Sequence, residues 1–187
     1  MTKSTKLLTA FLAIVLSIAF TGCKEDDPQP ALEYKTEGYI KGKLTGISKD
    51  GSYTFNDDFN YTEYSTLVGG PSTYRINADG TYNVTLYRSD FAEYGSAAIS
   101  FKLSNATDTT PENIDISFTY SKELSDKFVT FSIDTDADNT QAITDFTFDA
   151  TTGKAKGKFS ISGLENSTGK SATATGDFDV TTKKVVQ

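Results

Sequence analysis

The chain has 187 residues, with no histidine, no tryptophan and a single cysteine, and its formal net charge at pH 7 is −7. These absences exclude catalysis by Ser-His-Asp or Cys-His groups, zinc sites built on imidazoles or several thiolates, iron–sulfur clusters, haem held by histidine, and disulfides within the chain. The acidic balance disfavours nucleic acid as a partner. We therefore predict a protein that is not an enzyme.

The first 22 residues have the order of a secretion signal. Lys3 and Lys6 precede an apolar run from Leu7 to Phe20, which is followed by Thr21 and Gly22. The run is shorter than the roughly 20 residues that a helix needs to cross a bilayer. We predict that residues 1–22 are removed, and because they hold two lysines and no acid, the mature chain keeps 16 basic and 25 acidic side chains, a net charge of −9.

The residues at the predicted cleavage site are Phe20-Thr21-Gly22-Cys23. They resemble the lipobox of bacterial lipoproteins, with Phe20 in place of the smaller aliphatic residue usual in that family. The resemblance implies that Cys23 is the lipidation site and that the protein's first partner is a membrane, reached through a lipid anchor. Two or three acyl chains would make the attachment stable. The alternative is an ordinary secretory signal that happens to be followed by a cysteine.

A tether is predicted for residues 23–37. Lys24-Glu25-Asp26-Asp27 is highly charged, and the prolines of Pro28-Gln29-Pro30 disfavour helix and strand pairing. The acidic cluster resembles the surface-export signal of Bacteroidetes-type lipoproteins, which implies an outer-membrane protein on the cell surface. A plain solvated spacer, with the domain on the periplasmic face, is the alternative.

Residues 38–187 are predicted to form a single all-β domain. Apolar and polar residues alternate in run after run, for example at Ile114, Ile116, Phe118 and Tyr120, as expected of strands with one buried face. Glycine-containing turns separate the runs, which favours antiparallel neighbours. About ten such strands predict an antiparallel β-sandwich or a small β-barrel. The repeated Lys-Gly-Lys at residues 41–43 and 156–158 is interpreted as a mark of two edge strands, where lysine discourages association.

One acidic segment has the spacing of a calcium loop. Asp134, Asp136 and Asp138 alternate, and Asp145 is the twelfth residue counted from Asp134, which resembles the ligand spacing of an EF-hand. The match is partial, because Asn139 replaces the usual glycine and Asp145 replaces the usual glutamate. The segment therefore predicts either a Ca²⁺ site, the one cofactor considered for this chain, or a solvated acidic loop.

Two further features could belong to a site. Asp57 shares the parity of Phe55 and Phe59 and would point inward, unless a bulge or turn at Asn56-Asp57-Asp58 reverses the face, which is the interpretation we favour. Several tyrosines are expected to be partly exposed and could contact sugars or proteins; they are Tyr61, Tyr64, Tyr74, Tyr87 and Tyr94.

A modification site is predicted in a long polar segment. Asp108-Thr109-Thr110 resembles the short O-glycosylation sequon of Bacteroidetes-type exported proteins, which implies a glycan on Thr109. The whole chain resembles the small surface lipoproteins of such bacteria that have no assigned activity.

Three functions are compatible with these observations. The first is a non-catalytic surface module that binds a glycan or an envelope protein. The second is a lipocalin-like carrier of a small apolar ligand, which requires an internal cavity. The third is a carboxylate-dependent glycoside hydrolase, in which Asp57 or Asp58 would need a second acid at a suitable distance.

Overall fold

The computed structural model describes residues 37–48, 50–64, 71–90, 95–125, 127–133, 139–164 and 169–185. The predicted signal peptide, Cys23 and nearly all of the tether lie outside these residues. The described residues belong to one compact unit that spans Lys35–Gln187. Within them the chain forms eleven strands, and no residue is assigned to a helix. The all-β prediction is therefore confirmed.

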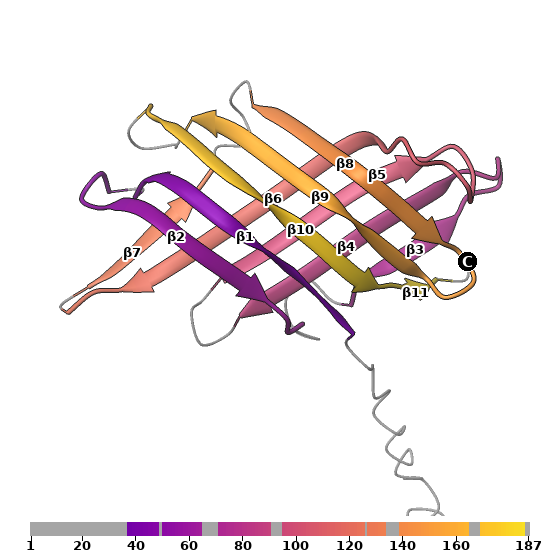
Figure 1. The fold of residues 1–187 in the computed structure, drawn as a ribbon, viewed down its shortest axis with the longest axis horizontal. Coiled ribbons are helices and arrows are strands. Elements are labelled where there is room, and N and C mark those ends of the chain that lie inside the picture. Colours follow the sequence, from indigo (N-terminus) through magenta and orange to yellow (C-terminus); the bar gives the residue numbers. More distant parts are fainter. Residues whose placement is uncertain are drawn as a thin grey trace, which may run out of the picture. The chain divides into compact units, whose positions relative to one another are not determined.

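The strands form two sheets (Figure 1). The five-stranded sheet has the antiparallel order β2, β1, β10, β9, β8, and the six-stranded sheet has the order β11, β3, β4, β5, β6, β7, in which β11 and β3 alone are parallel. Their bounds are β1 Gly38–Ile47, β2 Thr54–Tyr61, β3 Thr73–Ile76, β4 Tyr82–Asp90, β5 Gly95–Leu103, β6 Glu112–Glu123, β7 Phe128–Ser132, β8 Thr140–Asp149, β9 Lys154–Leu164, β10 Ser171–Thr181 and β11 Lys183–Lys184.

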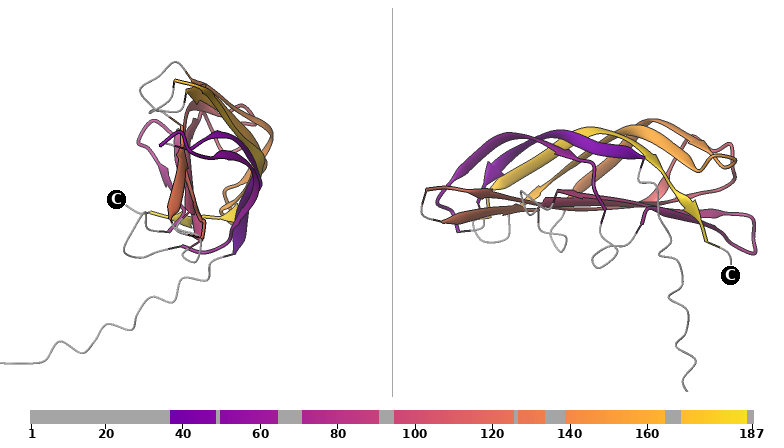
Figure 2. Two further views of the ribbon diagram at one scale, coloured as in Figure 1. Left: turned by 90° about the vertical axis from the view of Figure 1, so that its left-hand side faces the viewer. Right: turned by 90° about the horizontal axis from the view of Figure 1, so that it is seen from below.

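The two sheets pack face to face as a sandwich and do not close into a barrel, which decides between the two predicted architectures (Figure 2). The strands of one sheet cross those of the other in projection (Figure 1). Crossed sheets of this kind share corners at which a strand leaves one sheet for the other. β10 does so through Thr182, because β11 pairs with β3, and the chain after β2 does so where Glu63 bridges Ser89 of β4.

Aromatic rings from both sheets fill the space between them. Phe59 of β2 lies 4.8 Å from Phe118 of β6, measured between ring centroids, and Phe146 of β8 lies 5.0 Å from Phe101 of β5. Phe148 contributes further contacts near the β8–β9 hairpin. These rings occupy the interface between the sheets that an apolar ligand would need, so this packing argues against the lipocalin-like alternative.

Buried tyrosines add polar ties to this core. Tyr61 donates its hydroxyl proton to Thr119 O at 2.9 Å, and Tyr74 donates to Ala150 O at 2.9 Å, in each case from one sheet to a residue of the other or its hairpin. Tyr61, Tyr74 and Tyr87 are 0%, 6% and 7% exposed. The expectation that these three tyrosines are partly exposed is therefore wrong; the hydroxyls of Tyr61 and Tyr74 find their partners inside the sandwich.

The Lys-Gly-Lys repeats do not mark edge strands, since β1 and β9 both lie inside the five-stranded sheet. Their glycines face the core. One row across the sheet reads Phe59, Gly42, Gly176, Phe159, and the two phenylalanine rings lie 6.3 Å apart although two strands separate them. Strands are about 4.8 Å apart, so the rings meet only because the two intervening residues have no side chains.

The exposed edges are protected in other ways. In the described residues β11 has two residues and β7 has five, β8 is interrupted by a register shift between Thr144 and Thr147, and β2 directs Asp57 inward. Short strands, bulges and inward-pointing charges all discourage the addition of a strand from a neighbouring molecule.

We predict that Gly42→Ala is strongly destabilising. A Cβ atom at residue 42 would lie 2.0 Å from Thr175 O and 2.6 Å from the Cα of Gly176. The expected loss is about 3 kcal/mol, because backbone on both strands must move. Gly80→Ala is the control, since nothing lies within 4 Å of its Cβ and only its φ of +82° is unfavourable, at a cost of about 1 kcal/mol. Urea unfolding midpoints that fall equally in the two variants would contradict this explanation.

Candidate functional site

Most of the residues of the predicted calcium site lie outside the described part of the chain. This applies to Asp134, Asp136 and Asp138, as it does to Cys23. Asp145 is described and lies in β8, six residues after Asn139. Residues 140–145 therefore run as an extended strand, which rises about 3.3 Å per residue, whereas the ligands of an EF-hand come from a curled loop.

The Asp145 carboxylate has a different role from the one predicted. Asp145 has a φ of +51° at the register shift of β8, and its Oδ2 accepts a hydrogen bond from Lys158 Nζ at 2.6 Å. The assignment of Asp145 as the residue that closes an EF-hand-like loop is therefore corrected, because the bulge turns it toward β9. Calcium binding by the three other aspartates stays a prediction.

Thr109 lies in the exposed connection between β5 and β6. Asp108 organises this loop, since its carboxylate accepts hydrogen bonds from Ser104 N at 2.9 Å, Ser104 Oγ at 2.6 Å and Thr110 N at 2.8 Å. These bonds, led by that of the Ser104 hydroxyl, lower the pKa of Asp108. Thr109 is thus presented on an ordered turn, and its glycosylation stays a prediction.

Asp57 points inward, and the bulge that we favoured is absent. The pairing of β2 with β1 runs without interruption through Asp57 and Leu44. The Asp57 carboxylate accepts a hydrogen bond from Lys122 of β6, which also lies 5.5 Å from the ring centroid of Tyr53. The bond to Asp57 is the main cause of the raised pKa of Lys122. This ion pair therefore joins the two sheets.

The geometry does not support the hydrolase alternative at these residues. Asp57 and Asp58 are neighbours in a regular strand and project from opposite faces of the five-stranded sheet. Asp57 is engaged with Lys122, and Asp58 is exposed on the outer face. The two carboxylates cannot flank one glycosidic bond.

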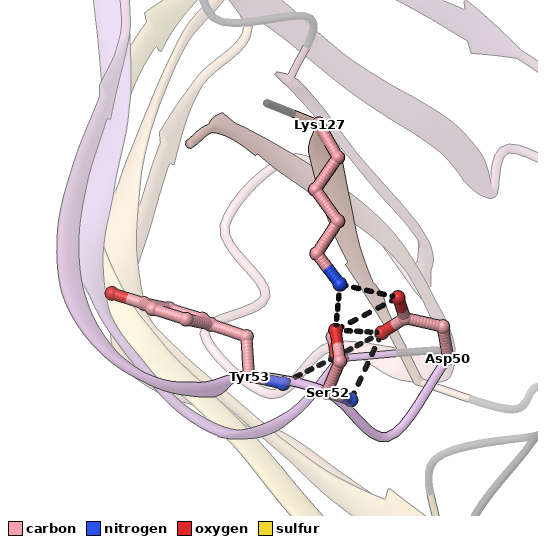
Figure 3. Close-up of polar contacts among 5 residues, drawn as sticks. Asp50, Ser52, Tyr53 and Lys127 are labelled. Atoms are coloured by element: carbon pink, nitrogen blue, oxygen red, sulfur yellow. Dashed lines mark hydrogen bonds and ion pairs between the residues drawn. The ribbon is translucent and has the colours of Figure 1, made fainter. Parts of the chain in front are cut away.

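A second polar cluster joins the β1–β2 loop to the β6–β7 turn (Figure 3). Lys127 Nζ lies 2.6 Å from Ser52 Oγ and 3.3 Å from Asp50 Oδ2. The Asp50 carboxylate also accepts hydrogen bonds from Ser48 Oγ at 2.5 Å and Ser52 N at 3.0 Å. A lysine near a serine can act as a base in catalysis, but here the ammonium group is engaged by a carboxylate. The cluster therefore serves as a latch between two hairpins.

This latch predicts a specific pH dependence. Hydrogen bonds from Ser48, then Ser52, place the pKa of Asp50 well below its ordinary value of 3.8. A group whose pKa is lower in the folded state stabilises the fold above its ordinary pKa and loses that effect as the pH falls toward its folded value. We expect Asp50→Asn to be less stable than wild type at neutral pH, by a margin that is constant above about pH 5 and shrinks toward about pH 2.5.

The measurement is urea unfolding across this pH range. Asp58→Asn is the control, because Asp58 lies on the outer face of the same hairpin and makes no ion pair in the described residues. The interpretation fails if the margin for Asp50→Asn is the same at both ends of the range.

The best candidate for ligand binding is a hollow of about 530 Å³ beside the first described residue. We call it the Glu37 pocket; it is lined by Glu37, Thr147, Phe148, Asp149, Thr152, Lys154, Lys156 and Thr181. Its size falls within the range of small-molecule sites. The β8–β9 hairpin and the end of β10 form it, on two successive cross-strand rows.

Some polar side chains of the Glu37 pocket already form ion pairs or hydrogen bonds within the domain, and others do not. Lys154 pairs with Asp179 at 3.1 Å, and the Asp149 carboxylate accepts hydrogen bonds from Thr151 N and Thr152 Oγ1, both at 2.8 Å. Lys156 makes no ion pair in the described residues. The pocket thus offers an ammonium group and hydroxyls, which suits recognition of a polar ligand, whereas the Phe148 ring packs inward on Tyr74 and Tyr82.

A shallower groove crosses the outer face of the six-stranded sheet. One part, about 300 Å³, is lined by Thr73, Arg75, Asn83, Thr85 and Val185. An adjoining part of about 200 Å³ shares Asn83 and Thr85 with it. Thr85 Oγ1 and Ser100 Oγ lie 3.2 Å apart and form a hydrogen bond. The groove is smaller than the Glu37 pocket.

Arg88 was missed by the sequence analysis, although a signal was present. It continues the alternation of Tyr82, Val84 and Leu86 and therefore occupies an inward-facing position. The side chain is 1% exposed, and burial lowers the pKa of Arg88 to about 10. Two of its four hydrogen bonds are made with Glu37 O and Gly38 O at the start of β1.

Comparison with models of protein families, with curated proteins and with solved structures found no match to this chain. No group of three or more acidic, histidine or cysteine side chains that could hold a metal ion occurs in the described ranges. Nor does that part of the chain contain a helix long and apolar enough to span a membrane.

Proposed function

We propose that this chain is a cell-envelope lipoprotein, anchored through Cys23 in the outer membrane at the cell surface, and that its β-domain is a non-catalytic module that binds a glycan. The observation that carries the proposal is the position of the only cysteine, directly after a charged, apolar and small-residue sequence of signal-peptide order. A tether then separates Cys23 from the domain.

The absence of histidine, together with the use of the inward-facing charges as structural ties, supports a binding role over a catalytic one. Asp57 and Lys122 form an ion pair between the two sheets, and the exposed Lys127 is likewise engaged between two hairpins. The Glu37 pocket keeps polar groups on the outer surface, where sugar hydroxyls could form hydrogen bonds with Lys156 and the threonines. A protein partner in the envelope is the alternative ligand.

We predict that Cys23→Ala moves the protein from the membrane fraction to the soluble fraction, because no acyl chain can then be attached. Thr21→Ala is the matched control, since it changes the same motif and keeps the cysteine. Protease added to intact cells should digest the wild-type domain. Membrane retention of Cys23→Ala equal to that of wild type would contradict the anchor, and a wild-type protein protected in intact cells would contradict surface exposure.

We predict that binding to a printed panel of neutral and acidic oligosaccharides depends on the Glu37 pocket. The double variant Thr147→Val with Lys156→Ala should reduce oligosaccharide binding about tenfold or more. Loss of a hydrogen bond from a charged donor weakens affinity by at least about that factor. Lys43→Ala is the control, since Lys43 is exposed on the same sheet and does not line the pocket. The assignment fails if the wild type binds none of the panel or if the double variant binds equally well.

A further inference from the structure

Arg88 is a buried cation that pairs with no carboxylate of the described residues. None of the five ion pairs in the described residues includes it, although its side chain is among the largest that are fully buried. Taking a guanidinium group out of water is costly unless its donors are satisfied. Here backbone carbonyls and one hydroxyl satisfy them.

The four hydrogen bonds of Arg88 reach the start of β1, Ser72 and the neighbouring Tyr87. Nη2 donates to Glu37 O at 2.7 Å and Nε donates to Gly38 O at 3.3 Å. Nη1 donates to Ser72 Oγ at 2.8 Å and to Tyr87 O at 2.7 Å. Ser72 is itself 3% exposed, and its hydroxyl accepts a hydrogen bond from Tyr87 N at 2.9 Å. One side chain of β4 thus connects the six-stranded sheet to the first residues of β1.

The start of β1 is held from its own sheet as well. Glu37 O accepts a hydrogen bond from Thr181 N at 3.1 Å, and Gly38 pairs with Val180 of β10. Gly38 has a φ of +116°, and a Cβ there would lie 2.0 Å from Asp179 O. The chain therefore enters the domain at a closely packed point.

This arrangement matters for a force applied through the preceding residues. Because β1 and β10 are antiparallel and Gly38 lies at the end of their ladder, a pull on Gly38 would open the ladder one residue pair at a time. Bonds broken in succession resist force poorly. The bonds from Arg88 come from the opposite sheet, so they oppose this peeling at its first step.

We propose that Arg88 is a positioning residue that clamps the start of β1, so that tension arriving from the lipid tether is shared by both sheets and does not peel β1 from β10. The tension rests on the proposed anchoring at Cys23, whereas the clamp is a property of the domain alone. The experiments below use the mature chain with an unmodified Cys23, so failure of the clamp is distinguishable from failure of the anchor.

The first experiment measures amide hydrogen exchange in wild type, Arg88→Lys and Arg88→Met. Arg88→Lys keeps the charge and loses the fork of donors, so it provides a result if Arg88→Met does not fold. The control is Lys122→Met, which removes another cation that joins the two sheets away from Gly38. We expect exchange at residues 38–41 to rise about tenfold or more in the Arg88 variants, with little change at β6 and β7. Unchanged exchange at residues 38–41, or an equal rise throughout both sheets, would overturn the proposal.

The second experiment applies force between the thiol of Cys23 and a tag after Gln187. Arg88→Lys should open at lower force than wild type, whereas Lys122→Met should open at the wild-type force in its first step. An Arg88→Lys domain that opens at the wild-type force, or a Lys122→Met domain weakened to the same degree, would overturn the clamp.

Discussion

The inner faces of the two sheets meet mainly through aromatic rings, and the crossing of the sheets determines where those rings can reach one another. Phe59 and Phe118 meet at one part of the interface, and Phe148 and Tyr74 at another, with ring centroids 4.8 and 5.3 Å apart. Gly42 and Gly176 lie between Phe59 and Phe159 in one row of the five-stranded sheet, and a Cβ at either glycine would lie 2.0 Å from a backbone oxygen of the adjacent strand. Aromatic burial and close strand approach thus depend on each other, and this packing positions every other feature of the domain.

Polar contacts join the two sheets as well. Arg88 connects the sheets at the start of β1, while Lys122 and Lys127 connect them around the β1–β2 hairpin. These charged side chains, which are of the types that act in catalysis, therefore hold hairpins and sheets together. The polar groups that these ties leave unused lie on the outer surfaces, among them those of the Glu37 pocket, which is larger than either part of the groove on the six-stranded sheet.

The strands were predictable because alternation survives wherever one face is buried. The run Ile114, Ile116, Phe118 and Tyr120 is the inner face of β6, of which Ile116, Phe118 and Tyr120 are fully buried. The choice of sandwich over barrel was not predictable, because it depends on which strands become edges, and local patterns do not encode that. Long-range pairing also explains the error over Lys-Gly-Lys, since a core-facing glycine and an edge glycine look alike without their neighbours.

The candidate site was predictable only in part. The parity of Asp57 indicated an inward side chain, yet the favoured interpretation was a bulge, because the partner that makes an inward carboxylate tolerable, Lys122, is 65 residues away in the sequence. Arg88 was detectable as the next inward position after Leu86. From the sequence alone, however, a charged residue at that position suggests that the strand has ended, because two of the backbone carbonyls that bind it are distant in the chain. The Glu37 pocket combines residues from three separate segments, so no local sequence motif predicts it.

The proposed function requires that Cys23 is acylated and so holds the domain at the membrane. The most direct test is mass spectrometry of the amino-terminal peptide from the protein isolated from its native membrane. The account predicts a peptide that begins at Cys23 and carries the mass of a diacylglyceryl group. A peptide with a free thiol at Cys23, or one that still contains residues 1–22, would contradict it.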